Sequence, residues 1–334
     1  MKNKKKVALV TGGAGFVGSH MVDLLLKKNF YVNVIDDLSG GTINNLKNHF
    51  KNKNFNFEKR DLCKLNINHK FFFGCDYVFH FAGKGDIVPS IENPIKYLDV
   101  NIMGTAKVLE AAKKAGVKKL VYSASSSCYG MAKTPTSEND IINPLYPYAM
   151  SKYLGEKLCF HWFKLYKLPV NSIRIFNAYG PRVKTTGVYG AVFGVFFKQK
   201  LENKAFTIVG NGNQKRDFVF VTDVVDAFFK ASQTKISGEI FNLGTGKPNS
   251  INHLVKILGG KKIYIPKRPG EPNITCANPR KIKKILKWKP KVKFENGVKI
   301  MMKDIKKWKN APLWNPNSIK KATKSWFNYM RNIK

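Results

Sequence analysis

The chain has 334 residues, of which 43% are hydrophobic and 13% aromatic, so it is long enough and apolar enough to bury a large core. Its formal net charge is +38, and only seven of the 59 basic residues are Arg, with the lysines spread along the chain. These features exclude a disordered chain, a membrane span of roughly 18 apolar residues and a specific nucleic-acid reader, which would cluster its bases and favour Arg.

Apolar segments with strand and helix character alternate over the first 180 residues. Buried strands are predicted at 6–13, 30–37, 77–83, 118–126 and 170–181, and helices at 17–29, 101–116 and 147–166. This alternation predicts an α/β fold, a doubly wound parallel Rossmann sheet with helices on both faces. The sheet domain is expected over 1–180, completed by later segments.

The later part of the chain is less regular. Gly, Pro and Asn become more frequent from about residue 181, which predicts a smaller substrate-binding lobe over 181–309, at the carboxyl edge of the sheet. A helical tail is expected over 310–334. One apolar stripe predicts that this tail docks as a terminal helix: Ile319, Ala322, Trp326, Phe327 and Met330.

Five cysteines are scattered along the chain without CxxC spacing. They predict neither a disulfide framework nor a zinc site, and no metal is expected. The N-terminal apolar run of four residues is too short for a secretory signal, so we expect a cytoplasmic protein.

A glycine-rich turn, "TGGAGFVG", lies between the first strand and the first helix. Three of its glycines are spaced three residues apart: Gly12, Gly15 and Gly18. Such a turn lets the backbone approach a pyrophosphate, and the helix N-terminus that follows offers free N–H groups. Asp36 and Asp37 end the second strand, where a carboxylate would bind ribose hydroxyls and repel a 2′-phosphate, so NAD is predicted rather than NADP. Asp61 and Leu62 either contact the adenine or simply end a strand.

The stretch "YPYAMSK" predicts an acid–base pair. Tyr148 and Lys152 are four residues apart and share a helix face, whereas Tyr146 and Tyr153 are expected only to pack. A lysine ammonium and a cationic nicotinamide nearby would favour the tyrosine phenolate, which could then take a proton from a sugar hydroxyl.

Together, "TGGAGFVG" and "YAMSK" resemble the extended short-chain dehydrogenase/reductase superfamily, and most closely its nucleotide-sugar epimerases and dehydratases. The resemblance runs over about residues 5–309. It implies tightly held NAD, a C-terminal nucleotide-sugar lobe and a homodimer formed through helices at about 95–115 and 147–166. It also implies further neighbours of the cofactor beside Tyr148 and Lys152: Phe16, Val17, Ala82, Gly83, Asn101 and Phe176.

The same resemblance identifies the third catalytic residue. In "SASSSCYG", counting back four positions from Tyr129 gives Ser125, which would bind the reacting hydroxyl. The dehydratases resembled carry an Asp-Glu pair after this position, and the decarboxylases carry a Glu, where this chain has Ser126 and Ser127. The chain is therefore expected to return the hydride, as a nucleotide-sugar 4-epimerase. A dehydratase or reductase, or a non-catalytic NAD- or polyanion-binding protein, are the alternatives.

The substrate residues are also implied by the resemblance. Arg216 and Arg268 would hold the diphosphate, and Glu271 a ribose hydroxyl. Asn177, in "FNAYGP", would contact the sugar or phosphate, and Ser125 and Tyr148 the sugar. Thr275 would lie beside the sugar's 2-substituent, where its small size favours N-acetylhexosamines, with glucuronate also open. A UDP-linked sugar is the expected partner, without specific nucleic acid.

Overall fold

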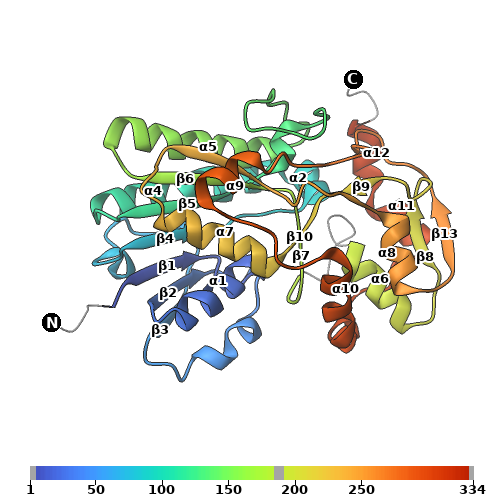
Figure 1. Cartoon of the computed structure of the whole chain (residues 1–334), viewed down its shortest axis with the longest axis horizontal. Coiled ribbons are helices and arrows are strands. Elements are labelled where there is room, and N and C mark those ends of the chain that lie inside the picture. The colour runs from blue at the N-terminus through green and yellow to red at the C-terminus, as the bar shows by residue number, and fades with distance from the viewer. Residues whose placement is uncertain (1–4, 184–191, 331–334) are drawn as a thin grey trace.

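A seven-stranded parallel sheet forms the centre of the computed structural model, which describes residues 5–183 and 192–330 (Figure 1). Its strands follow the order β3–β2–β1–β4–β5–β6–β11, and all neighbouring strands pair in parallel. Their bounds are β1 Val7–Thr11, β2 Tyr31–Asp36, β3 Phe55–Lys59, β4 Tyr77–His80, β5 Lys119–Ser125, β6 Val170–Ile175 and β11 Glu239–Leu243. The predicted Rossmann sheet is confirmed. Its strand order reverses between β1 and β4, which places a ligand crevice at their carboxyl ends.

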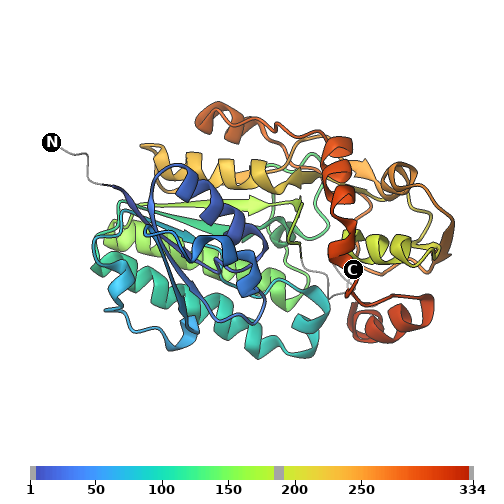
Figure 2. The same ribbon diagram turned by 90° about the horizontal axis from the view of Figure 1, so that it is seen from below.

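Helices cover both faces of this sheet (Figure 2). On one face lie α1 (Phe16–Lys27), α7 (Val221–Gln233) and α9 (Arg280–Leu286). On the other lie α2 (Ile87–Glu92), α3 (Pro94–Leu98), a π-helical segment (Asp99–Met103), α4 (Gly104–Lys114) and α5 (Pro147–Tyr166). Among the helices in the described ranges, none is both long and apolar enough to cross a membrane.

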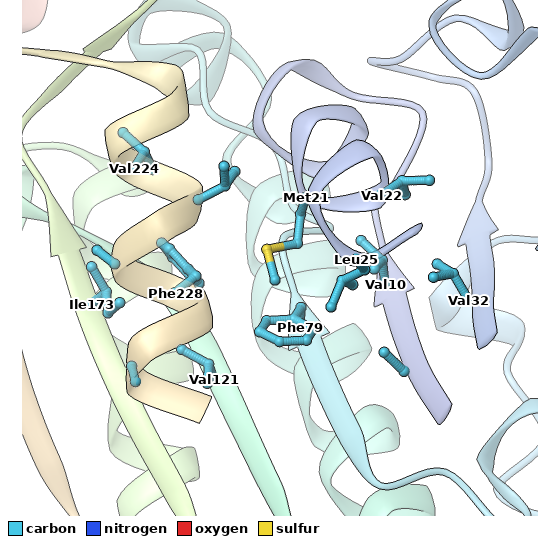
Figure 3. Close-up of a cluster of buried hydrophobic side chains, with 14 of the residues drawn as sticks. Val10, Met21, Val22, Leu25, Val32, Phe79, Val121, Ile173, Val224 and Phe228 are labelled. Atoms are coloured by element: carbon cyan, nitrogen blue, oxygen red, sulfur yellow. The ribbon is translucent and has the colours of Figure 1, made fainter. Parts of the chain in front are cut away.

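The sheet core follows from the alternation of side chains along each strand. Val10 faces α1 and α7, whereas its neighbour Leu9 belongs to the cluster beneath α4 and α5. Figure 3 shows the first cluster, in which Met21 of α1 lies over Phe79 of β4, and Phe228 of α7 lies to one side of them. Each such fully buried side chain stabilises the fold by about 1.5–3 kcal/mol. The strands therefore form a rigid platform for the loops at their carboxyl ends.

The remaining elements build a smaller lobe beside that edge (Figure 1). They are β7 Asn177–Tyr179, α6 Val192–Leu201, β8 Phe206–Val209, β9 Lys215–Arg216, β10 Phe218–Phe220, β12 Asn249–Ser250, α8 Ile251–Leu258, β13 Lys262–Ile265 and α10 Phe294–Lys303. Its core is aromatic: Tyr179 stacks on Phe193 with ring centroids 5.0 Å apart, and Phe218 stacks on Phe294 at 5.0 Å. β7 follows β6 of the sheet after one residue and pairs with β10, so the chain passes directly from the sheet into the lobe.

The tail forms two short helices and not the single terminal helix that the sequence predicts. These are α11 (Pro316–Ala322) and α12 (Lys324–Met330), separated at Thr323, whose hydroxyl donates back to the Lys320 carbonyl at 3.3 Å. The predicted docking is confirmed for the buried Ile319, Trp326 and Met330. Ala322 and Phe327 are only half-buried.

Candidate active site

The glycine-rich loop lies where β1 meets the loop after β4. Gly12 has a φ of +70°, and a Cβ at this position would lie 2.6 Å from the backbone nitrogen of Ala82. Only glycine satisfies both conditions. Gly15 is the N-cap of α1 and supplies no side-chain cap, and Phe16, Val17 and Gly18 form the first turn of that helix. The loop can therefore admit a phosphate group to the helix N-terminus.

The acidic residues predicted to bind the cofactor lie at the carboxyl ends of β2 and β3. Asp36 is buried, and its carboxylate accepts hydrogen bonds from the backbone N–H groups of Ala14 at 2.9 Å and Leu38 at 2.8 Å. Burial raises the pKa of Asp36, and these hydrogen bonds oppose that effect. Asp37 is exposed, while Asp61 caps the turn after β3. Leu62, beside it, is buried.

A buried histidine that the sequence analysis missed joins β4 to β1. His80 lies between the hydroxyls of Thr11, at 2.6 Å, and Thr105, at 2.9 Å. Burial lowers the pKa of His80 to about 3, so the ring is neutral. In the sequence, the polar His80 within the apolar segment 77–83 could have indicated this network. The network fixes the ends of the two strands that border the crevice.

Asn101 ties the loop after β4 to the helix that carries the acid–base pair. Its Oδ1 accepts from the Lys84 backbone N–H at 2.8 Å, and its Nδ2 donates to the Ser151 hydroxyl at 2.8 Å. A Cβ on Gly83 would lie 2.8 Å from Asn101 Oδ1 and 3.6 Å from Lys152 Nζ. Asn101 lies in the π-helical segment, an irregularity frequent at functional sites.

Ser125, Tyr148 and Lys152 come together at the edge of the sheet. Ser125 ends β5, and Tyr148 and Lys152 lie on the first turns of α5. The Tyr148 and Ser125 side chains are hydrogen-bonded, and Ser125 Oγ also accepts from the Ser127 N–H at 3.2 Å. Lys152 Nζ lies 4.4 Å from the centre of the Tyr122 ring. Spacing selected Tyr148 and Lys152, one turn apart on α5, and the resemblance selected Ser125, which is hydrogen-bonded to Tyr148 in the fold.

Burial dominates the proton affinities of this group. Burial raises the pKa of Tyr148, the hydrogen bond with Ser125 lowers it, and the charge of Asp86 raises it further. Burial also lowers the pKa of Lys152 to about 8. The lowered tyrosine pKa expected from the sequence is therefore not reached by the chain on its own. Sequence analysis missed Asp86, whose signal was a carboxylate three residues after "FAG".

A pocket in the smaller lobe contains four of the predicted substrate residues in its lining: Asn177, Arg216, Arg268 and Glu271. Glu271 forms ion pairs with both arginines: Arg216 Nη2 lies 2.6 Å and Arg268 Nη1 lies 3.7 Å from its carboxylate oxygens. The Thr275 hydroxyl donates a hydrogen bond to Asn177 Oδ1 at 2.9 Å. Thr275 is therefore connected to the pocket through the side chain of Asn177. Two guanidinium groups and one carboxylate suit a diphosphate joined to a ribose.

Two further residues, Phe176 and Asp217, are neighbours in the chain of the pocket residues Asn177 and Arg216. Phe176 continues β6 by donating its N–H to Leu243 at 3.0 Å, and its ring is 6.5 Å from that of Tyr129. Asp217 was missed by the sequence analysis; it is fully buried next to Arg216 and holds two neighbouring loops. Its carboxylate accepts from the backbone N–H groups of Thr245, Gly246 and Ala277.

The described residues contain no group of His, Cys, Asp or Glu that could hold a metal ion. Cys63, Cys75, Cys128, Cys159 and Cys276 are all free thiols.

The sequence was compared with those of known families and proteins. The GDP-mannose 4,6 dehydratase family matches residues 9–301. A putative UDP-glucose 4-epimerase of Methanocaldococcus jannaschii is 38% identical over 299 residues, which cover 87% of this chain and 95% of that protein.

Solved structures gave similar matches. A UDP-N-acetylglucosamine 4-epimerase from Methanobrevibacter ruminantium M1, in complex with UDP-N-acetylmuramic acid, superposes with a TM-score of 0.84 at 31% identity. A UDP-glucuronic acid 4-epimerase from Bacillus cereus, in complex with UDP-glucuronic acid and NAD, also gives 0.84, at 32% identity. In both cases the match covers 90% of this chain and 99% of the other.

Proposed function

The chain belongs to the GDP-mannose 4,6 dehydratase family, and from this membership and the geometry of its site we propose that it is an NAD-dependent nucleotide-sugar 4-epimerase. One observation carries the choice of reaction. Ser125, Tyr148 and Lys152 are assembled for alcohol–ketone chemistry, while Ser126 and Ser127 stand where elimination of water would need carboxylates.

The residues at the crevice fit NAD. The glycine-rich loop leads from β1 into the N-terminus of α1, where a pyrophosphate could bind, and Asp36 and Asp37 offer carboxylates at the end of β2 for the adenosine ribose. Asp61 and Leu62, at the turn after β3, would contact the adenine, and Lys152 and Asn101 would contact the nicotinamide side. Bound NAD supplies a reversible hydride acceptor.

Residues of the chain itself carry out the proton transfer. Tyr148 takes the proton of the sugar 4-hydroxyl and returns it to the 4-oxygen, and Ser125 holds that oxygen by a hydrogen bond. The hydrogen bond with Ser125 lowers the pKa of Tyr148 and so opposes the effect of burial. A Lys152 ammonium one helical turn away would favour the phenolate as well. Because the hydride returns to the same carbon, neither an oxidant nor an acid pair is needed.

The pocket in the smaller lobe supports a UDP-linked substrate. Arg216 and Arg268 would exchange Glu271 for the diphosphate oxygens, leaving Glu271 for a ribose hydroxyl. Asn177 and Thr275 would face the sugar, where a small hydroxyl leaves room for an N-acetyl group. UDP-glucose, UDP-N-acetylglucosamine and UDP-glucuronate are therefore the substrates to compare, and the smaller lobe, which begins at β7 and excludes α7, β11 and α9 of the sheet domain, would bind them.

The test is direct. Purified protein is incubated with each of the three UDP-sugars, and the C4 epimers are resolved by chromatography. We expect interconversion of at least one pair without net formation of reduced cofactor, and a loss of at least about a thousandfold in Tyr148→Phe with UDP binding retained. Accumulation of a stable keto sugar would instead favour a dehydratase.

We further propose that the protein is a cytoplasmic homodimer. Apolar side chains stand exposed on the helices at 94–114 and 147–166, including Ile95 at 66%, Met103 at 54% and Leu154 at 38%. Covering these side chains with a second copy would bury them. The free cysteines are in keeping with a reducing compartment. Light scattering after size exclusion tests the dimer, and a monomer would refute it.

A further inference from the structure

The tail contributes to the substrate pocket although it lies beyond residue 301, where the family match ends. Ile319 of α11 is 5% exposed and lines the same pocket as Arg216, Arg268 and Glu271. In Figure 1, α12 stands above α11 on the side of the lobe that faces the sheet domain. The tail is therefore built into the site rather than attached to the outer surface of the lobe.

Trp326 of α12 fastens the loop that carries the two charged substrate residues. Its indole Nε1 donates to the Pro269 carbonyl at 2.6 Å, and its side chain is 3% exposed. One residue on, Gly270 has a φ of +67°, and a Cβ there would lie 2.8 Å from Met330 Cε. The backbone between Arg268 and Glu271 thus packs directly on α12.

The other side of the same tryptophan contacts the catalytic helix. Its ring lies 5.9 Å from that of Tyr146, which stacks on Tyr148 with centroids 6.3 Å apart and an interplanar angle of 11°. Ser325, its neighbour, donates to Glu92 Oε1 of α2 at 2.9 Å. Tyr146, expected only to pack, therefore packs between the tail and the predicted base.

We propose that α12 is a strap that holds the loop 268–271 at a fixed position relative to α5, with Trp326 as the positioning residue. This inference rests on the proposed function, in which the loop grips the nucleotide and α5 acts on the sugar. A sugar that must present both faces of C4 to one base needs a nucleotide anchor that does not move. Trp326 joins the anchor and the base through a hydrogen bond on one side and a ring contact on the other.

The experiment uses the full chain and UDP as the probe. Trp326→Ala removes both contacts, and we expect UDP to bind about tenfold more weakly by calorimetry, because the hydrogen bond and the ring contact are lost together. Trp326→Phe keeps a ring against Tyr146 but lacks the donor, so its UDP affinity should fall about threefold. Tyr329→Ala is the matched control, because Tyr329 is an aromatic residue on the same helix that is 68% exposed.

Two further readouts separate positioning from general damage. NAD affinity should stay within twofold of wild type in all three variants, and the KM for the UDP-sugar should rise more than kcat falls. Equal losses of UDP and NAD affinity, or wild-type UDP affinity in both Trp326 variants, would refute the strap. A wild-type chain that does not bind UDP would refute the proposed function itself, and with it the premise of this inference.

Discussion

Lys152 is a buried cation, and replacing it with methionine should stabilise the fold while it removes activity. The side chain is 6% exposed, and burial lowers its pKa from 10.5 to about 8. The difference between these two values corresponds to about 3 kcal/mol of folding free energy that the charged form costs. Methionine keeps a similar length and apolar stem without the charge, so Lys152→Met should gain about 3 kcal/mol at pH 7.

The sign of this effect sets its pH window. The unfolded chain binds more protons at this lysine than the folded chain between pH 8 and pH 10.5, so stability rises with pH across that range. The cost is fully present below pH 8, where Lys152 is charged in both states. It disappears above pH 10.5, where the lysine is neutral in both. The advantage of Lys152→Met should therefore shrink as the pH rises from 8 towards 10.5.

Urea unfolding of nucleotide-free protein at pH 7 and pH 9.5 measures this difference. Lys157→Met is the matched control, because Lys157 is exposed on the same helix and its replacement should change stability by less than about 0.5 kcal/mol at both pH values. If Lys152→Met were no more stable than wild type at pH 7, or if its advantage did not shrink at pH 9.5, the assigned burial cost would be wrong.

Two other substitutions test the surroundings of the site. Glu156→Ala leaves the buried guanidinium of Arg174, 2.6 Å from the Glu156 carboxylate, without an opposite charge, so urea unfolding should show a loss of about 3–5 kcal/mol. Glu110→Ala breaks only a half-exposed pair and should cost about 1 kcal/mol or less; equal losses would contradict this reasoning. Asp86→Asn removes a negative charge that raises the pKa of Tyr148, so the rise of kcat/KM with pH should move to lower pH. An unchanged profile would mean that Asp86 does not influence the base.

The sheet and the pair of Tyr148 and Lys152 could be predicted because their signals are local. The strand ending in Thr11, the glycines after it and the four-residue spacing of Tyr148 and Lys152 all depend on short-range geometry. Ser125 required the family resemblance, because no short-range rule links the end of β5 to α5. These residues were named by type and spacing, and the fold then placed them together.

Other features depend on contacts between distant segments. Nothing near Trp326 in the sequence indicates that its indole reaches Pro269, 57 residues earlier. The pKa of Tyr148 was expected to be lowered by a neighbouring cation, but burial, which is a property of the whole fold, raises it instead. The single tail helix was predicted from an apolar stripe, and the break at Thr323 shows that periodicity alone does not fix where a helix ends.

The position of Asp86 bears on why the site favours epimerisation. Elimination of water needs one group to remove a proton from carbon and a second to protonate the leaving hydroxyl. Ser126 and Ser127 supply neither of these groups. Asp86 raises the pKa of Tyr148, so that Tyr148 holds a proton more tightly. Tyr148 therefore keeps the proton of the 4-hydroxyl while the sugar is a ketone, and it returns that proton when the returning hydride makes the 4-oxygen an alkoxide, a stronger base than a phenolate. Such a site favours reversal of its own oxidation, and epimerisation follows whenever the sugar presents its other face before that reversal.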